Sequence, residues 1–431
     1  MPKKAYKKYK GADIEQSSNA SVENIDNQSI RSENSEVSES SNLFEVNEEN
    51  KVSLIMDTVT DSIDKLYENN PLIKINSLKC LNKIFQRHYL DIDDDWNYID
   101  TLIEGLEKIV RKNKEIEQLY ATQVFATFIV QGGSPIASRL NGKIKEIFEP
   151  IYRNLSICPK IRQAALYVIS ISYFFSLELN WNELRTSMGN MESVFKGSYL
   201  KGDGNHPNVK PEQFQLHIVA LECWSLLFTM IPSHMIMDII SPILVKFHQL
   251  LKSLDVDIRI TAGISLAVIY ERIRNEINSR FKGHDYASLI GELELLATDG
   301  LKSRSKTERK KQRQSFRDIF TAIQSESVEF PSYKIQFASE FLEIDTWSDK
   351  CRYDALCSIL DAGINRHLQE NMFIREIFDL GLPIVVNKAN IQSKLTHKQR
   401  YLANQASAKI RNQNRQNYRV KRMNANFTPS D

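Results

Sequence analysis

Apolar positions recur with helical spacing from about residue 54 to residue 300, and one short unit appears five times. Each copy has a large apolar residue, a small residue two to four places later, and then further apolar positions. The copies are Ile75–Leu81, Leu119–Phe125, Ile161–Tyr167, Leu216–Glu222 and Ile258–Ile264. Each is expected to open a helix.

The spacing of these units predicts the fold. Their small residues Ser77, Ala121, Ala165, Ala220 and Ala262 are separated by 44, 44, 55 and 42 residues. A helical repeat of about 40–47 residues is typical of HEAT and armadillo arrays, where small residues allow neighbouring helices to stack closely. The sequence therefore predicts an all-α, armadillo/HEAT-like helical-repeat solenoid.

Gly and Pro divide this region. The long interval contains Gly189–Pro211, which we interpret as an inserted loop, and Gly132–Pro135, Cys158-Pro159, Ile231-Pro232 and Ser241-Pro242 are expected to separate helices. The aromatic residues Phe174, Phe175, Trp224 and Phe228 are interpreted as core of the stack rather than as part of a cofactor site.

The pattern changes after residue 300. A basic run ends in an apolar stripe, Phe316, Ile319, Phe320 and Ile323, which predicts an amphipathic helix docked on the last repeat. Residues 334–347 alternate apolar and polar positions, which indicates a short extended or hairpin element, and two helices are expected at about 348–360 and 372–380.

Charge is separated along the chain, although the net charge is only +2. Residues 11–50 contain ten Asp or Glu and one Arg, whereas residues 380–430 contain ten Lys or Arg and no acid. A segment with one sign of charge and few apolar residues cannot form its own core. We expect a disordered head at 1–50, repeats at 51–300, a C-terminal region with a basic helix at 301–385, and a basic tail helix at 386–431.

The basic residues are the candidate RNA-binding residues. They are Lys302, Arg304, Lys306, Arg309, Lys310, Lys311 and Arg313 in the first run, and Lys394, Lys398, Arg400, Lys409, Arg411, Arg415, Arg419, Lys421 and Arg422 in the tail. Tyr401 and Tyr418 are candidates for stacking on bases. A solvated tail and a nuclear-import signal are the alternative interpretations of these runs.

Motifs for catalysis are missing from the pattern. The eight histidines form no HExxH pair, Gly142-Lys143 lacks the upstream glycine of a P-loop, and the five scattered cysteines contain no CxxC. Residues 1–10 have no apolar signal region, and the most apolar run, residues 164–177, is too short to span a bilayer. We expect a soluble intracellular protein that is not an enzyme, without cofactor, metal, small-molecule substrate or membrane partner.

Several short sequences in the C-terminal region resemble the interferon-related developmental regulator family. They are Leu295–Asp299, Lys310–Ile319, Asp345–Trp347, Arg352–Ala355, His367–Asn371 and Arg375–Gly381, and the tail adds Lys394–Lys398. The armadillo-like repeats also match that family in kind, whereas the acidic head and the 189–211 segment have no obvious counterpart.

The resemblance implies two roles. One is a translational regulator that binds inactive ribosomes, with the helical body across the tRNA path and the basic C-terminus in the mRNA channel. The other is a transcriptional co-regulator that holds protein partners on the concave face of the solenoid and uses its basic runs for nuclear import. The expected partners are accordingly the ribosome, through rRNA and ribosomal proteins, or transcriptional regulators, in the cytoplasm or also in the nucleus.

Overall fold

The computed structural model describes residues 48–90, 92, 96–140, 142–298, 306–325 and 330–383, with the side chains of 48–51 and 306–309 left out. The chain divides into two compact units, Met1–Lys51 and Val52–Asp431, and almost all of the described residues belong to the second. The expectations for the acidic head and for the tail from residue 384 lie outside the described residues.

Five helices form a continuous row in which each packs on the next. They are α2 (Pro71–Arg87), α4 (Glu115–Arg139), α6 (Pro159–Phe175), α8 (Pro211–Phe228) and α11 (Val256–Glu276). Each carries one of the small marker residues, and all five markers are buried. Because small side chains bring helix backbones close together, the repeat predicted from the sequence is confirmed.

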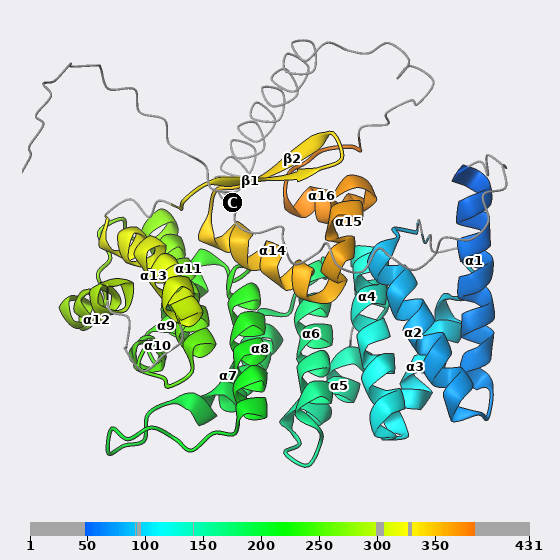
Figure 1. Cartoon of the computed structure of the whole chain (residues 1–431), viewed down its shortest axis with the longest axis horizontal. Coiled ribbons are helices and arrows are strands. Elements are labelled where there is room, and N and C mark those ends of the chain that lie inside the picture. Colours follow the sequence, from blue (N-terminus) through cyan, green and yellow to red (C-terminus); the bar gives the residue numbers. More distant parts are fainter. Residues whose placement is uncertain are drawn as a thin grey trace, which may run out of the picture. The chain divides into compact units, whose positions relative to one another are not determined.

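The repeats contain further helices besides those in the row. They are α1 (Glu48–Asp64), α3 (Ile99–Arg111), α5 (Lys143–Arg153), α7 (Trp181–Phe195), α9 (Ser233–Ile240) and α10 (Leu244–Leu250), with short 3-10 turns η2 (Lys65–Tyr67) and η3 (Lys196–Ser198). Helices α3, α5 and α7 contact α4, α6 and α8, respectively, and α9 and α10 contact α11. The fold is an all-α helical-repeat solenoid (Figure 1).

The buried aromatic residues belong to its core, as expected. Trp224 stacks on Phe228 with ring centroids 5.2 Å apart, and Phe175 is also buried. All five cysteines are free thiols. Within the described part of the chain, no helix is both long enough and apolar enough to cross a membrane.

One of the sequence interpretations is confirmed and another needs correction. At Gly132–Pro135 the backbone of Gly133 leaves the helical conformation, with φ 52° and ψ −136°, so a kink there divides α4 into two helical stretches, as expected. The segment from Gly189 is not loop throughout, because α7 continues to Phe195 and buries Met191 and Phe195. Apolar residues at helical spacing outweighed the glycine in α7.

The basic run after the repeats forms the helix that was expected. Helix α13 (Lys306–Gln324) packs on α11 and on α12 (Tyr286–Thr298). Phe316, Ile319 and Ile323 are fully buried, and Phe316 and Ile319 lie against Gly263 of α11. This stripe docks on the last repeat, so the prediction is confirmed.

A C-terminal module follows, which we define as residues 333–377. It contains the predicted hairpin, formed by β1 (Tyr333–Phe337) and β2 (Glu340–Ile344), which pair antiparallel with Tyr333 opposite Ile344. Helix α14 (Trp347–Leu360) and helix α16 (Met372–Ile377) were expected, whereas the short turn η4 (Asp361–Gly363) and helix α15 (Ile364–Glu370) were missed.

The C-terminal module folds back onto the row of repeat helices. Helix α14 contacts α2, α4, α8 and α11, α15 contacts α2, and α16 contacts α4 (Figure 1). We call the side of the row on which the module lies the repeat face. The end of the described chain is thus fixed to helices from the first repeat to the last.

Candidate nucleic-acid interface

The basic helix α13 is held by two arginines of α11. Buried Arg259 donates a hydrogen bond to Gln312 in the middle of α13. Arg274 donates to the carbonyl oxygens of Ile323 at 2.9 Å and of Ala322 at 3.4 Å, in the last turn of α13. A cation suits the negative end of a helix, where carbonyl groups lack helical partners. Helix α13 is therefore rigidly attached to the last repeat.

Only part of the predicted basic run can be placed. Lys310 and Arg317 are exposed on α13 and are seven residues apart, which puts them on one face, opposite the buried stripe. Lys311 forms a 2.7 Å ion pair with Asp257 that is exposed on both sides, and Arg313 is half-buried. Lys306 and Arg309 begin α13, but their side chains, like Lys302 and Arg304, lie outside the description.

The predicted tail residues, from Lys394 to Arg422, and the stacking candidates Tyr401 and Tyr418 also lie outside the described residues. The segment that leads to the tail is described as far as Pro383, and Arg375 holds it. Arg375 is 1% exposed and donates to the carbonyl oxygens of Gly381 at 2.8 Å and of Leu382 at 3.0 Å. The root of the tail is thus tied to α16.

Arg375 also joins the parts of the C-terminal module to one another. Its Nη1 and Nη2 atoms lie 3.2 and 3.0 Å from the two carboxylate oxygens of Glu340, a bidentate ion pair in which both side chains are buried. Nη1 additionally donates to the carbonyl oxygen of Leu368 at 2.8 Å. One guanidinium group connects β2, α15, α16 and the following loop, and its buried charge is both paired and hydrogen-bonded.

The start of α14 is capped by the solenoid. Buried Glu271 of α11 accepts bonds from the backbone N–H groups of Trp347 at 2.6 Å and Ser348 at 3.0 Å, and from the Ser348 hydroxyl at 2.7 Å. A carboxylate at a helix N-terminus meets unpaired N–H groups and the positive end of the dipole. Burial raises the pKa of Glu271, and these three bonds oppose that shift.

The opposite end of the module is fixed to α2 and α4. His367 is fully buried, and its Nε2 donates to the carbonyl oxygen of Phe85 at 3.0 Å while its Nδ1 accepts from Asn371 at 3.3 Å. Asn371 donates to the carbonyl oxygen of Val130 at 2.8 Å, and its own oxygen caps α16. These partners require the neutral imidazole, and burial lowers the pKa of His367 to about 4.

Three further contacts lie between these ends. Gln86 donates to the carbonyl oxygen of Ile359 at 2.8 Å, and Arg352 donates to the carbonyl oxygen of Thr229 at 3.2 Å. Gly363 packs so closely on α2 that a Cβ atom there would lie 1.7 Å from the carbonyl oxygen of Gln86. The module therefore needs a glycine at this position. Together these contacts attach the module to the repeat face from one end to the other.

Protonation of His367 is expected to weaken the module at low pH. Its pKa is lower in the folded state, about 4, than the ordinary value of 6.5. The stabilisation is therefore present above pH 6.5 and is lost as the pH falls towards 4, by roughly 3 kcal/mol in all. We expect urea unfolding of His367→Gln to show a smaller loss of stability over this range than the native chain.

The matched control for this measurement is the exposed His206, which lies in the loop after α7. His206→Gln should follow the native pH dependence. If the His367 variant lost as much stability as the native chain between pH 6.5 and pH 4, then His367 would not be the titrating group.

The residues that carry the family resemblance are those that attach the C-terminal module. Trp347, Arg352, His367, Asn371 and Arg375 all lie in the short sequences noted above, and each forms one of these contacts. Sequence reasoning used them only as signs of resemblance and did not predict their partners. Among the described residues, no cluster of His, Cys, Asp and Glu could hold a metal ion.

Comparison with known proteins agrees with these sequences. The family model described as "Interferon-related developmental regulator (IFRD)" matches residues 24–324, and the "Interferon-related protein conserved region" matches residues 371–423. The second match begins at Asn371 and includes most of the basic tail. The two family models thus cover the solenoid, helix α13 and the tail.

Similar whole proteins and structures were also found. Interferon-related developmental regulator 1 from Sus scrofa and from Homo sapiens are each 33% identical, over 75% of this chain and 71% of theirs. Interferon-related developmental regulator 2 from Mus musculus is 30% identical over 75% of this chain and 73% of its own. A designed armadillo repeat protein shares 15% identity and a TM-score of 0.39, over 61% of this chain and 99% of its own. On the family models and these relatives, the chain belongs to the interferon-related developmental regulator family.

Proposed function

We propose that this protein is a translational regulator that binds inactive ribosomes, with its solenoid across the tRNA path and its basic C-terminal tail in the mRNA channel. The observation that carries the proposal is the tail itself. Residues 380–430 contain ten Lys or Arg and no Asp or Glu, and the family's conserved-region model matches most of this segment. Such a segment requires a polyanion as its partner.

The physical chemistry of the tail favours an RNA-walled channel. A helix over about residues 393–422 would be roughly 45 Å long. Alone in water it would be marginal, because its like charges repel and it has little apolar surface to bury. RNA phosphates on several sides would neutralise the Lys and Arg, and Tyr401 and Tyr418 would have bases on which to stack.

The described residues supply a rigid support for this tail. Arg375 ties its root to the C-terminal module, and Glu271, His367 and Asn371 tie the module to the repeat helices. Helix α13 adds a second basic surface with Lys310 and Arg317 exposed. A rigid body with a basic extension suits a binding site in which shape and charge are both recognised.

The alternative function is a transcriptional co-regulator that holds protein partners on the solenoid. The C-terminal module covers part of the repeat face, which counts against this alternative. Because α14, α15 and α16 lie on repeat helices, a partner could reach only what the module leaves open. We therefore favour the ribosome as the principal partner.

Deletion of residues 388–431 tests the proposal. The truncated protein is expected to leave ribosomes in a low-salt sucrose gradient, whereas the full chain sediments with them, and its circular dichroism should still show a folded helical protein. Deletion of residues 11–47, which contain eight Asp or Glu and one Arg, is a control of comparable length and opposite charge, and it should leave co-sedimentation unchanged. Persistent ribosome binding by the 388–431 deletion would exclude insertion of the tail as the basis of binding.

A further inference from the structure

The loop between α11 and α12, residues 277–285, carries two cations that the sequence analysis did not single out. They are Arg280 and Lys282, which we call the loop cations. Both are exposed, and neither side chain forms an ion pair with the described residues. The loop therefore presents positive charge to its surroundings.

The acidic groups at the two ends of this loop face other partners. Glu276, the last residue of α11, accepts hydrogen bonds from Nε and Nη2 of Arg272, both at 2.7 Å. Asp285 faces α10, where burial lowers the pKa of His248 and the nearby Asp285 carboxylate opposes that shift. The charge of the loop cations is therefore not cancelled within the loop.

The loop is fixed to the C-terminal end of α13. Arg274 donates from Nε to the carbonyl oxygen of Phe281 at 3.1 Å, and its other nitrogens bond to the last turn of α13. The Tyr270 hydroxyl donates to the carbonyl oxygen of Lys282 at 2.7 Å, and the Tyr286 hydroxyl donates to a carbonyl oxygen in that last turn at 3.0 Å. The loop and the end of α13 thus form one rigid surface (Figure 1).

Helix α13 adds two further exposed cations to this surface. Arg317 lies six residues before Ile323, where the loop is attached, and Lys310 lies seven residues before Arg317, so the steps along the helix axis are about 9 and 10 Å. Asp318, half-buried beside Arg317, is the one carboxylate among the described side chains of α13. We define the end surface by its four exposed cations: Arg280, Lys282, Lys310 and Arg317.

We propose that the end surface binds the phosphate backbone of double-stranded RNA. Cations on a rigid frame suit phosphates that a duplex holds in place, whereas single strands are generally held by stacking of bases on aromatic rings. The aromatic rings at the loop are already covered. Phe281 packs against Tyr270 with ring centroids 5.4 Å apart, and the ammonium group of Lys282 lies over the ring of Tyr286. The end surface therefore offers charge without a platform for bases.

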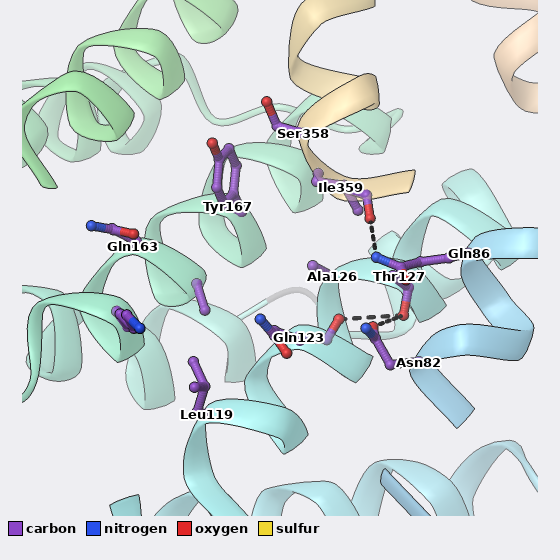
Figure 2. A pocket seen from close by; sticks show the side chains of 12 residues that line it. Asn82, Gln86, Leu119, Gln123, Ala126, Thr127, Gln163, Tyr167, Ser358 and Ile359 are labelled. Carbon is purple, nitrogen blue, oxygen red and sulfur yellow. Dashed lines mark hydrogen bonds between the residues drawn. The ribbon is translucent and has the colours of Figure 1, made fainter. Parts of the chain in front are cut away.

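The hollow of the repeat face beside the end of α14 is not suited to the same ligand. It has a volume of about 260 Å³ and is lined mainly by uncharged side chains, among them Gln123, Gln163 and Tyr167 (Figure 2). Lys160 is the one cation among its lining residues. Because a single lysine cannot neutralise successive phosphates, we place the duplex at the end surface.

This inference rests on the proposed function only in taking RNA as the polyanion. None of the four cations belongs to the tail, so the end surface is a second site that acts without it. Four phosphate contacts alone correspond to weak, sequence-independent binding, with a Kd on the order of 10⁻⁴–10⁻⁶ M. The chain without residues 388–431 is therefore still expected to leave ribosomes during sedimentation.

A fluorescein-labelled RNA hairpin with a 12-base-pair stem tests the proposal by anisotropy titration. The background is the full-length chain in which the ten Lys and Arg of residues 388–422 are replaced by glutamine, so that the tail does not mask the second site. Arg280→Gln/Lys282→Gln in this background removes two contacts and should lower the slope of log K against log salt by about 1.4–1.8. Between 50 and 200 mM salt, its affinity should fall about tenfold less than that of the background.

Two control variants separate the position of the charge from its amount. Lys160→Gln/Lys201→Gln makes the same change in net charge at two exposed lysines away from the end surface, and it should keep the slope of the background. Arg280→Lys/Lys282→Arg keeps the charge of the loop and should keep the slope too, because counterion release depends on charge.

The outcomes also separate this site from the tail. An unchanged slope in Arg280→Gln/Lys282→Gln, or an equal loss in Lys160→Gln/Lys201→Gln, would overturn the proposal. So would displacement of the hairpin by a 12-nucleotide poly-uridine as readily as by the unlabelled hairpin. Each of these results would leave ribosome binding through the tail intact, because that hypothesis is tested by sedimentation of the 388–431 deletion.

Discussion

Replacement of Arg375 by methionine is expected to lower the free energy of unfolding by about 3–5 kcal/mol, because breaking a buried ion pair by removal of one partner is strongly destabilising. Glu340 is 3% exposed, so its carboxylate would stay in the interior without this bidentate partner. The carbonyl oxygens of Leu368, Leu380 and Gly381 would lose their donor at the same time. Urea unfolding followed by circular dichroism measures the loss in free energy of unfolding. Faster hydrogen exchange in α14–α16 would show that the loss arises in the C-terminal module.

The hairpin itself provides the matched control. Lys334 on β1 lies 3.8 Å from Glu343, and the two side chains are 61% and 36% exposed. Lys334→Met should change stability by less than about 1 kcal/mol, because exposed ion pairs contribute little. Arg375→Met combined with Glu340→Leu should recover part of the loss. Equal stability of Arg375→Met and the native chain would show that the buried pair does not hold the module together.

The repeat architecture could be predicted because packing leaves a local pattern. The marker residues are small because a neighbouring helix passes close to each of them. All five lie at the predicted positions in the row: Ser77, Ala121, Ala165, Ala220 and Ala262. The stripe on α13 was recognisable for the same reason. Burial against another helix selects residue type at a spacing of three or four, and this spacing can be read without knowing the partner.

The docking of the C-terminal module could not be predicted in the same way. The docking bonds run from side chains to backbone carbonyl oxygens: His367 to Phe85, Asn371 to Val130, Arg352 to Thr229 and Gln86 to Ile359. Every residue has a backbone carbonyl group, so such a bond constrains the type of the donor residue but not the type of the acceptor residue. The acceptor therefore cannot be identified from the sequence. The partner of Gly133 could not be predicted either. The kink in α4 accommodates Phe373, which is 240 residues away in the chain.

The candidate RNA surface was predicted from charge alone. Charge shows which side chains can meet phosphate, but it does not show which are already paired. Lys311 bonds to Asp257, whereas Lys310 and Arg317 are exposed. An acidic partner 54 residues away in the chain cannot be identified from a run of lysines. The tail from Lys394 onward stays a prediction from sequence and family resemblance.

Neutralisation of the tail is expected to remove most of the salt dependence of ribosome binding. The variant replaces Lys394, Lys398, Arg400, Lys409, Arg411 and Arg415 with glutamine and keeps the length of the chain. Each phosphate contact contributes about 0.7–0.9 to the slope of log K against log salt, so loss of six contacts lowers the slope by about 4–5. Between 50 and 200 mM salt, the affinity of the native chain should fall on the order of a thousandfold more than that of the variant.

The control for this experiment keeps the charge and changes the side chains. With the three lysines replaced by arginine and the three arginines by lysine, the tail retains its charge and should retain the native slope, because counterion release depends on charge and not on the cation's shape. Binding is measured by co-sedimentation with a fixed amount of ribosomes at each salt concentration. A native slope in the glutamine variant would place the phosphate contacts elsewhere on the protein, with the exposed Lys310 and Arg317 of α13 as the next residues to replace.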